Sequence, residues 1–241
     1  MAAPRKVKAV VENIHYYKDG ITRFILKPEI KCRFKPGQFL HLALDPYDPS
    51  YNWPESRVFS IASSNKKHEL EILISPKGDF TNSMVTSLKV DDVVWIKLPY
   101  GDFNLNKSND NSIVLVAGGT GISPFIGFLE DLQYETTKKS KVHLYYGVRS
   151  QDHIIYDKLL TNLKENLNHF KLDLFIEKNS SPIDYPHQSG IIDIDQILND
   201  TIDIDNTVYY VSGSPSLISN FIDKANAKGI DNDKVKFDKW D

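Results

Sequence analysis

The sequence contains very little cysteine. Among its 241 residues only Cys32 is a cysteine. A disulfide framework and a four-cysteine zinc site require several cysteines, and iron–sulfur clusters are held mainly by cysteine thiolates. With one cysteine, these 241 residues cannot form a disulfide framework, a four-cysteine zinc site or a cysteine-ligated iron–sulfur cluster. Lys31 and Arg33 flank Cys32 and would lower its pKa if it were exposed, but no base or second thiol is nearby. The seven histidines lack a spacing such as H-E-x-x-H, so we expect no metal.

An excess of basic charge is also missing. The chain holds 29 Lys and Arg against 32 Asp and Glu, which gives a net charge of −3 and a pI near 6.2. Binding to nucleic acid or to an anionic membrane needs a concentrated basic surface. We therefore expect no nucleic-acid partner, which leaves small molecules and proteins. Residues 1–107 carry a net charge of +4 and the remainder −7. This asymmetry is either ordinary surface variation or a basic docking face for an acidic protein.

Hydrophobic runs of the kind that target or span membranes are absent too. The N-terminal residues Met1–Val11 lack the apolar stretch of a secretory signal. The longest uncharged run, Ile113–Leu129, approaches the roughly 20 residues of a membrane span. Closely spaced glycines, a threonine, a serine and a proline in its middle favour a buried strand, a tight loop and a helix instead. We therefore expect no membrane span and a cytoplasmic location.

The first half of the chain consists of short runs typical of strands. They hold β-branched, aromatic and alternating apolar residues, and turn sequences such as DG, PG and DPYDPS separate them. Several short strands with few helical stretches indicate an antiparallel barrel or sandwich. The expected strands are 7–17, 21–28, 38–44, 58–64, 70–76 and 93–99.

In the second half, strand-like and helix-like segments alternate. The alternation predicts a parallel sheet with helices on both faces. A polar stretch, 104–112, marks the boundary, so we expect two domains, 1–107 and 108–241. The expected strands are 113–119, 142–148, 171–177 and 207–213, and the expected helices are 124–138, 156–167, 193–200 and 216–229.

A glycine-rich segment, Val116–Pro124, ends the first of these strands and opens a helix. Glycines let the backbone approach a phosphate closely, and a helix N-terminus offers N–H groups and a partial positive charge. The spacing matches neither the Rossmann nor the P-loop pattern. The segment predicts a dinucleotide site, although a tight turn alone would also recruit glycine. The candidate binding residues are Gly118, Gly119, Thr120, Gly121, Ile122 and Pro124.

A second junction of strand and helix contains Ser212, Gly213, Ser214 and Pro215. Ligands of open α/β sheets bind along the carboxyl edge of the strands, where this junction lies. A simpler interpretation is a capped helix with Ser214 at the N-cap and Pro215 at the first helical position. The two interpretations are compatible.

In the β-rich half, Arg57, Phe59 and Ser60 interrupt a strand. Alternation places Arg57 and Phe59 on one face of the strand. A guanidinium suits a pyrophosphate, and an aromatic ring suits stacking on a flat heterocycle. An ordinary amphipathic strand would explain the same residues.

Taken together, these motifs resemble the ferredoxin–NADP reductase-like family of flavoprotein reductases, along essentially the whole chain. The family's flavin signature R-x-[YF]-[ST] corresponds to Arg57, Phe59 and Ser60. The resemblance implies that Arg57 holds the flavin phosphates, that Phe59 stacks on the isoalloxazine and that Ser60 lies near its N5 atom. It also implies a flavin barrel followed by a nicotinamide-binding α/β domain.

Other elements of the family follow in the expected order. Pro36–Phe39 is similar to P-G-Q-[FY], and Tyr146–Arg149 is similar to Y-G-x-R. Gly78–Thr81 is similar to the second phosphate element G-x-x-[ST], in which the loop N–H groups and the Thr81 hydroxyl meet the pyrophosphate. Ser212–Pro215 corresponds to C-G-x-P. The resemblance adds Val58, Ile74, Gly78, Phe80, Thr81 and Arg149 to the candidate cofactor-binding residues.

Three positions depart from the family pattern. Phe59 stands for the common tyrosine, and Ser212 stands for the cysteine of C-G-x-P. The aromatic residue that often ends the family and covers the flavin corresponds to Trp240, which could equally pack the C-terminus on the core. By resemblance, Ser60, Ser212 and Trp240 are the candidate catalytic residues.

The resemblance implies an NAD(P)H-dependent flavoprotein reductase with FAD as cofactor and NADH or NADPH as donor. Electrons would pass to a separate acceptor such as ferredoxin, flavodoxin or an oxygenase component, because these residues cannot carry a cysteine-ligated cluster. Two alternatives stay open. The protein would either reduce flavin as a diffusible substrate or act as a partner-dependent, FAD-binding electron-transfer subunit. The sequence does not predict the oligomeric state.

Overall fold

The computed structural model describes residues 3–105, 112–134, 140–178 and 185–238. They pack as two compact units. The first comprises Met1–Leu105 and Ser123–Glu130, and the second comprises Asn106–Ile122 and Asp131–Asp241. The expected boundary at residues 107 and 108 falls between described segments. The short stretch Ser123–Glu130 packs with the first unit, although its neighbours in sequence belong to the second.

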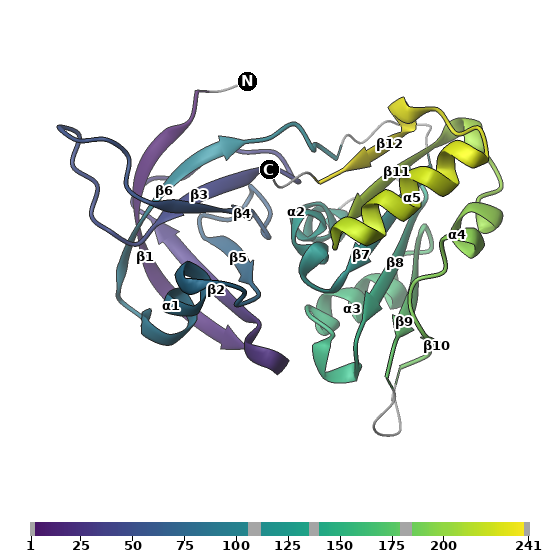
Figure 1. The fold of residues 1–241 in the computed structure, drawn as a ribbon, viewed down its shortest axis with the longest axis horizontal. Coiled ribbons are helices and arrows are strands. Elements are labelled where there is room, and N and C mark those ends of the chain that lie inside the picture. The colour runs from purple at the N-terminus through teal and green to yellow at the C-terminus, as the bar shows by residue number, and fades with distance from the viewer. Residues whose placement is uncertain (1–2, 106–111, 135–139, 179–184, 239–241) are drawn as a thin grey trace. The chain divides into compact units, whose positions relative to one another are not determined.

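The first unit is built around an antiparallel sheet with strand order β4-β3-β6-β1-β2-β5 (Figure 1). After β4 the chain turns back, and the Ala62 N–H donates to the Glu71 carbonyl on β5 at 2.7 Å. This bond joins the two edges of the sheet, so the sheet is a nearly closed barrel and the expected antiparallel barrel is confirmed. Its elements are β1 (Arg5–Tyr16), the short helix η1 (Lys18–Gly20), β2 (Thr22–Pro28), β3 (Phe39–Ala43), β4 (Ser56–Ser60), β5 (Leu70–Ile74), α1 (Asp79–Ser87) and β6 (Val93–Tyr100).

The barrel is filled by alternate side chains of its strands. On β1, Val7 and Ala9 are buried while Lys6 and Lys8 are exposed, as the two-residue period of a strand requires. Met84 of α1 is fully buried in the same core, so the helix covers part of the barrel. The other core residues include Phe24, Leu26, Leu40, Leu42, Ile72, Val94 and Ile96.

The second unit is built around a parallel sheet with strand order β10-β9-β8-β7-β11-β12. The chain starts in the middle at β7, proceeds outward to β10, then crosses back to β11 on the other side of β7. This reversal places a topological switch point between β7 and β11, where open α/β sheets bind ligands. The strands are β7 (Ser112–Gly118), β8 (Val142–Val148), β9 (Phe170–Ile176), β10 (Gln188–Ser189), β11 (Thr207–Ser212) and β12 (Val235–Phe237).

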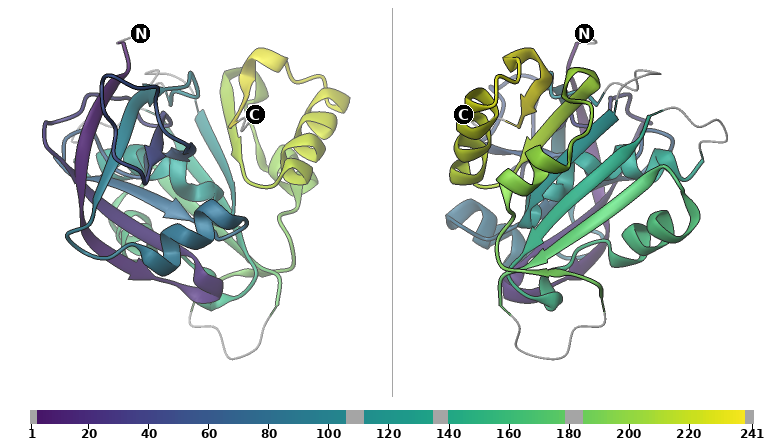
Figure 2. Two further views of the ribbon diagram at one scale, coloured as in Figure 1. Left: turned by 60° about the vertical axis from the view of Figure 1, so that its left-hand side comes forward. Right: turned by 90° about the vertical axis from the view of Figure 1, so that its right-hand side faces the viewer.

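Helices cover both faces of this sheet. Side chains of α4 and α5 share one core with Val114, Val116 and Tyr145 of the sheet. Figure 2 shows α3 on the opposite face. The expected parallel sheet with helices on both faces is thus confirmed. The helices are η2 (Gly119–Ile122), α2 (Ser123–Leu132), η3 (Gln151–His153), α3 (Asp157–Asn166), α4 (Ile194–Asp200), η4 (Ile204–Asn206), α5 (Pro215–Ala227) and η5 (Asn232–Lys234).

Several elements differ from the sequence-based expectation, among them the two-residue strand β10, which no expected strand covers. Residues 79–87, expected to begin as a phosphate-binding loop, form helix α1. Strand β12 was not expected, because three residues are too few to show a clear alternation. In the described segments, no helix combines the length and the apolar character needed to cross a bilayer.

Cys32 lies in the barrel core and not at the surface. Burial raises the pKa of its thiol to about 11, and the opposing effect of Arg5 is smaller. The flanking basic residues Lys31 and Arg33 therefore do not activate it.

We predict that Cys32 resists thiol reagents in the folded protein. At pH 8 a thiol with a pKa of about 11 is ionised in about one molecule per thousand, and the reagent must also reach a buried atom. Reaction with Ellman's reagent should be about a hundredfold slower in native protein than in 6 M guanidinium chloride. Cys32→Ala should show no reaction in either state. Equal rates in the two states would contradict the buried position.

Candidate functional site

Arg57 and the first turn of α1 meet at one end of the barrel. The side chain of Arg57 is half exposed and its guanidinium lies 5.1 Å from the centre of the Phe80 ring. Glu55 pairs with the same guanidinium at 2.7 Å. A cationic group is thereby held beside the N-terminus of a helix.

The N-terminus of α1 offers several backbone donors. The first backbone bond of the helix runs from the Asn82 N–H to the Gly78 carbonyl at 2.8 Å. The N–H groups of the preceding turn therefore have no partner within the helix, and they carry the positive end of the helix dipole. The Thr81 hydroxyl accepts from the N–H groups of Lys77 and Gly78 at 3.0 and 3.2 Å. It caps the helix, so an anion here would meet backbone N–H groups first.

The remaining flavin-signature residues lie deeper. Phe59 is 8% exposed and its ring belongs to the barrel core, opposite Leu40 on β3. Ile74 is also buried in this core. Ser60, at the end of β4, is nearly covered, and Val58 is half buried. The structure thus brings Arg57, Gly78, Phe80 and Thr81 together, whereas stacking by Phe59 stays a prediction.

In the second unit the ends of β7 and β11 lie side by side, since Ala117 pairs with Ser212. Gly121 fits there only because it has no side chain. A Cβ at this position would lie 2.4 Å from the Ser212 carbonyl oxygen. Gly213 has φ +155 and lies against Gly118. The glycine-rich turn and the Ser212–Pro215 turn therefore form one continuous backbone surface at the switch point.

The Ser212 hydroxyl has a partner that the sequence analysis missed. It lies 3.4 Å from Oδ2 of Asp238, and these residues are 1% and 4% exposed. Asp238 is positioned by its N–H, which donates to the Val211 carbonyl at 3.1 Å. The run Val235–Phe237, which pairs with β11 in parallel, is the local sequence feature that leads to it, but three residues are too short a signal to predict the strand.

Most of the other predicted residues of this edge lie in helices or directly after a strand. Ser214 caps α5 by accepting the Leu217 N–H at 3.2 Å, and Pro215 opens that helix, as the capped-helix interpretation predicted. Arg149 follows β8, and its carbonyl accepts the Lys178 N–H. Thr120 and Ile122 belong to η2, together with Gly119, and Pro124 belongs to the first turn of α2. Trp240 lies outside the described residues.

No group of three or more His, Cys, Asp or Glu side chains of the described residues could hold a metal ion.

Comparisons with known proteins agree with this arrangement. Residues 6–123 match the model of an FAD-binding domain, and residues 115–222 match that of an oxidoreductase NAD-binding domain. The propane 2-monooxygenase reductase component of Rhodococcus jostii is 27% identical over 215 residues, covering 86% of this chain and 55% of the relative. The anthranilate 1,2-dioxygenase electron transfer component of Acinetobacter baylyi is 30% identical over 192 residues, covering 77% and 52%. The chain thus spans about half the length of these relatives.

A solved structure shows the same fold. The Amycolatopsis cytochrome P450 reductase aligns with a TM-score of 0.83 at 20% identity, over 98% of this chain and 70% of that chain. The two domain models follow one another along the chain, as the barrel and the parallel sheet do. The chain belongs to the ferredoxin–NADP reductase-like family of FAD- and NAD(P)-binding oxidoreductases.

Proposed function

We propose that this chain is an NAD(P)H-dependent flavoprotein reductase that passes a hydride from nicotinamide to bound FAD and electrons to a separate acceptor. The observation that carries the proposal is a pair of anion-binding sites. One combines Arg57 with the N-terminus of α1, and the other is the glycine surface at the switch point. The reductase components among its relatives support the same reading.

The residues around Gly78 fit the phosphates of FAD. Gly78 has φ −163, which any residue adopts, and a Cβ there would meet no atom within 4 Å. Neither backbone strain nor crowding within the chain therefore requires a glycine at this N-cap position, whereas a phosphate seated close to the backbone would. Arg57 and the N–H groups of the first turn of α1 would hold that phosphate. FAD, when bound, accepts a hydride and releases electrons singly.

The nicotinamide dinucleotide would bind the second anion site. Its pyrophosphate would lie on the backbone of Gly118–Gly121, beside the N–H groups that begin the following helix. The Ser212 hydroxyl, held by Asp238, would orient the nicotinamide ring. Orientation by fixed hydrogen bonds favours one approach of the donor over others.

The acceptor would be a ferredoxin, a flavodoxin or an oxygenase component. With Cys32 as their single cysteine, these residues carry no cysteine-ligated cluster of their own. Electrons must therefore pass from the bound flavin to a redox centre outside these residues. A cytoplasmic location belongs to the proposal, because cells hold their reduced nicotinamide dinucleotides internally.

A second candidate function is favoured by the contacts of the flavin-signature residues. Glu55 occupies the guanidinium of Arg57, and Phe59 lies in the core. A phosphate would share the guanidinium with the Glu55 carboxylate, whose negative charge weakens phosphate binding, and weak binding suits a reductase that treats flavin as a diffusible substrate. A yellow purified protein that NADH or NADPH bleaches anaerobically would support bound FAD. A colourless protein that reduces added flavin would support the second function, and a protein that does neither would reject both.

We predict that Gly78→Ala lowers FAD occupancy without disturbing the fold. The new methyl group would meet no protein atom but would project into the space proposed for the phosphate. The ratio of absorbance at 450 nm to that at 280 nm should fall severalfold, while the FAD-free protein stays folded with only a small decrease in its thermal unfolding temperature, because alanine is a poorer N-cap than glycine. Ser87→Ala, in the exposed last turn of the same helix, is the control and should keep full occupancy. Full occupancy in Gly78→Ala would argue against a phosphate at this helix.

We also predict that Arg57→Ala and Ser212→Ala have separable effects. Loss of a charge-assisted hydrogen bond of about 1.5–3 kcal/mol should weaken FAD binding roughly tenfold to a hundredfold in Arg57→Ala. Ser212→Ala should keep its FAD but slow flavin reduction in anaerobic stopped-flow measurements. Glu55→Ala, which frees the guanidinium, should bind FAD at least as tightly as the unchanged protein. Unaltered FAD affinity in Arg57→Ala would refute the phosphate assignment.

A further inference from the structure

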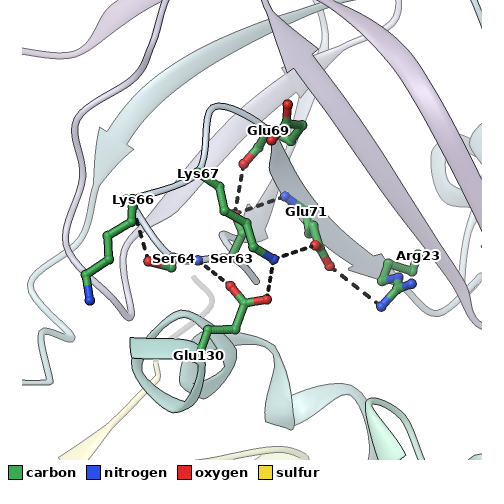
Figure 3. A network of polar contacts seen from close by, with 8 residues as sticks. All are labelled: Arg23, Ser63, Ser64, Lys66, Lys67, Glu69, Glu71 and Glu130. Carbon is green, nitrogen blue, oxygen red and sulfur yellow. Dashed lines mark hydrogen bonds and ion pairs between the residues drawn. The ribbon is translucent and has the colours of Figure 1, made fainter. Parts of the chain in front are cut away.

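Glu130 forms an ion pair with Lys67 within the barrel unit, in which the carboxylate is buried and the lysine side chain is 42% exposed (Figure 3). It lies on α2 and is 8% exposed. One carboxylate oxygen accepts the Ser64 N–H at 2.8 Å, and the other accepts the Lys67 ammonium at 2.5 Å. The same side chain therefore holds both the backbone and the side chains of the 63–67 segment.

The pair is part of a larger charged network. Lys67 also contacts Glu71 at 3.4 Å, and Glu71 contacts Arg23 at 3.7 Å (Figure 3). Burial raises the pKa of Glu130, and bonds from Lys67 and Ser64 oppose the rise. Burying the Glu130 carboxylate costs free energy that an apolar residue would not cost, and the lysine end of the pair is partly exposed to solvent, so the pair is weak evidence for stability alone. A role in fixing one arrangement of the backbone is therefore worth testing.

The segment held by Glu130 is fixed by hydrogen bonds on one side and by close packing of α2 on the other. On one side, the Ala62 N–H donates to the Glu71 carbonyl, and the Ser63 hydroxyl accepts the Glu71 N–H at 3.2 Å. On the other side, α2 lies directly on the backbone, because a Cβ on Gly127 would be 2.4 Å from the Ser63 carbonyl oxygen. Gly127 and Glu130 are three residues apart and so share one face of the helix.

The position of this segment in the chain relates its contacts to the two proposed cofactor sites. Residues 62–64 closely follow Ser60, the last residue of β4, which the family resemblance places near the flavin N5 atom. The first residue of α2 directly follows Ile122, the last residue of the glycine-rich turn. One helix is therefore joined covalently to the proposed dinucleotide loop and, through the Ser64 N–H, by a hydrogen bond to the segment that follows the proposed flavin strand.

We propose that Glu130 and Lys67 are positioning residues for hydride transfer. By holding α2 on Ser63 and Ser64 they fix the end of β4 that carries Ser60. The proposal rests on the proposed reductase function. The phosphate-binding groups of the barrel, Arg57 and the N-terminus of α1, lie outside this network. Loss of the pair should therefore slow the hydride step while FAD stays bound.

The test measures flavin reduction at 450 nm in anaerobic stopped-flow experiments with FAD-loaded protein. Glu130→Gln can still accept the Ser64 N–H but loses the ion pair. We expect its limiting rate at saturating NADH or NADPH to fall about tenfold, with FAD content and coenzyme dissociation constant within twofold of the unchanged protein. Lys67→Met should lose at least as much. Lys67→Arg, which keeps a cation opposite Glu130, should restore most of the rate.

The matched control is an exposed ion pair of the same residue types in the same unit. Lys27 and Glu12 lie 3.2 Å apart with side chains 57% and 39% exposed. Glu12→Gln should leave every measured quantity unchanged. Rates in Glu130→Gln that equal the unchanged protein, or that fall only in proportion to lost FAD, would overturn the positioning role. Absence of bleaching by NADH and NADPH in the unchanged protein would instead reject the reductase function itself.

Discussion

The segment from Ile61 to Ser64 carries the packing constraint on which the barrel unit depends. It continues β4, it closes the barrel through the bond between the Ala62 N–H and Glu71, and it receives helix α2 on the Ser63 carbonyl. These contacts are compatible only because Gly127 lacks a side chain. The helix could not lie this close with any larger residue unless the backbone moved. Close packing thus ties the end of the flavin-signature strand to a helix that follows the glycine-rich turn.

The two proposed anion sites attract anions by the same arrangement of backbone groups. Each sets the N-terminus of a helical segment beside the end of a strand, so that backbone N–H groups supply most of the positive potential. In the barrel unit the guanidinium of Arg57 adds to this potential. In the second unit small residues let the backbone itself form the surface. Sites formed by backbone groups need few specific side chains. Short glycine-containing motifs are therefore the main indication of these two sites in the sequence.

Much of this fold could be predicted from local patterns. Alternation located the barrel strands, and the switch to helical spacing located the parallel sheet. Alternation also put Arg57 and Phe59 on one face, which is correct, because they oppose Leu42 and Leu40. It could not show that this face lines the barrel, so the burial of Phe59 was missed. The partners of Glu130, separated from it by 63 and 66 residues, leave no local pattern at all.

The register of the parallel sheet decides which groups share the edge of the second unit. Ala117 pairs with Ser212, and Val211 pairs with Phe237, so residues from three distant parts of the chain end in one row. Asp238 reaches Ser212 because it follows Phe237 by one residue. A slip of one position would turn every side chain of the strand to the opposite face and would part this hydroxyl from its carboxylate. The packing of α4 and α5 on the apolar residues of one face opposes such a slip, since different side chains would then meet these helices. The packing of the core of this unit therefore determines which side chains meet at the edge of its sheet.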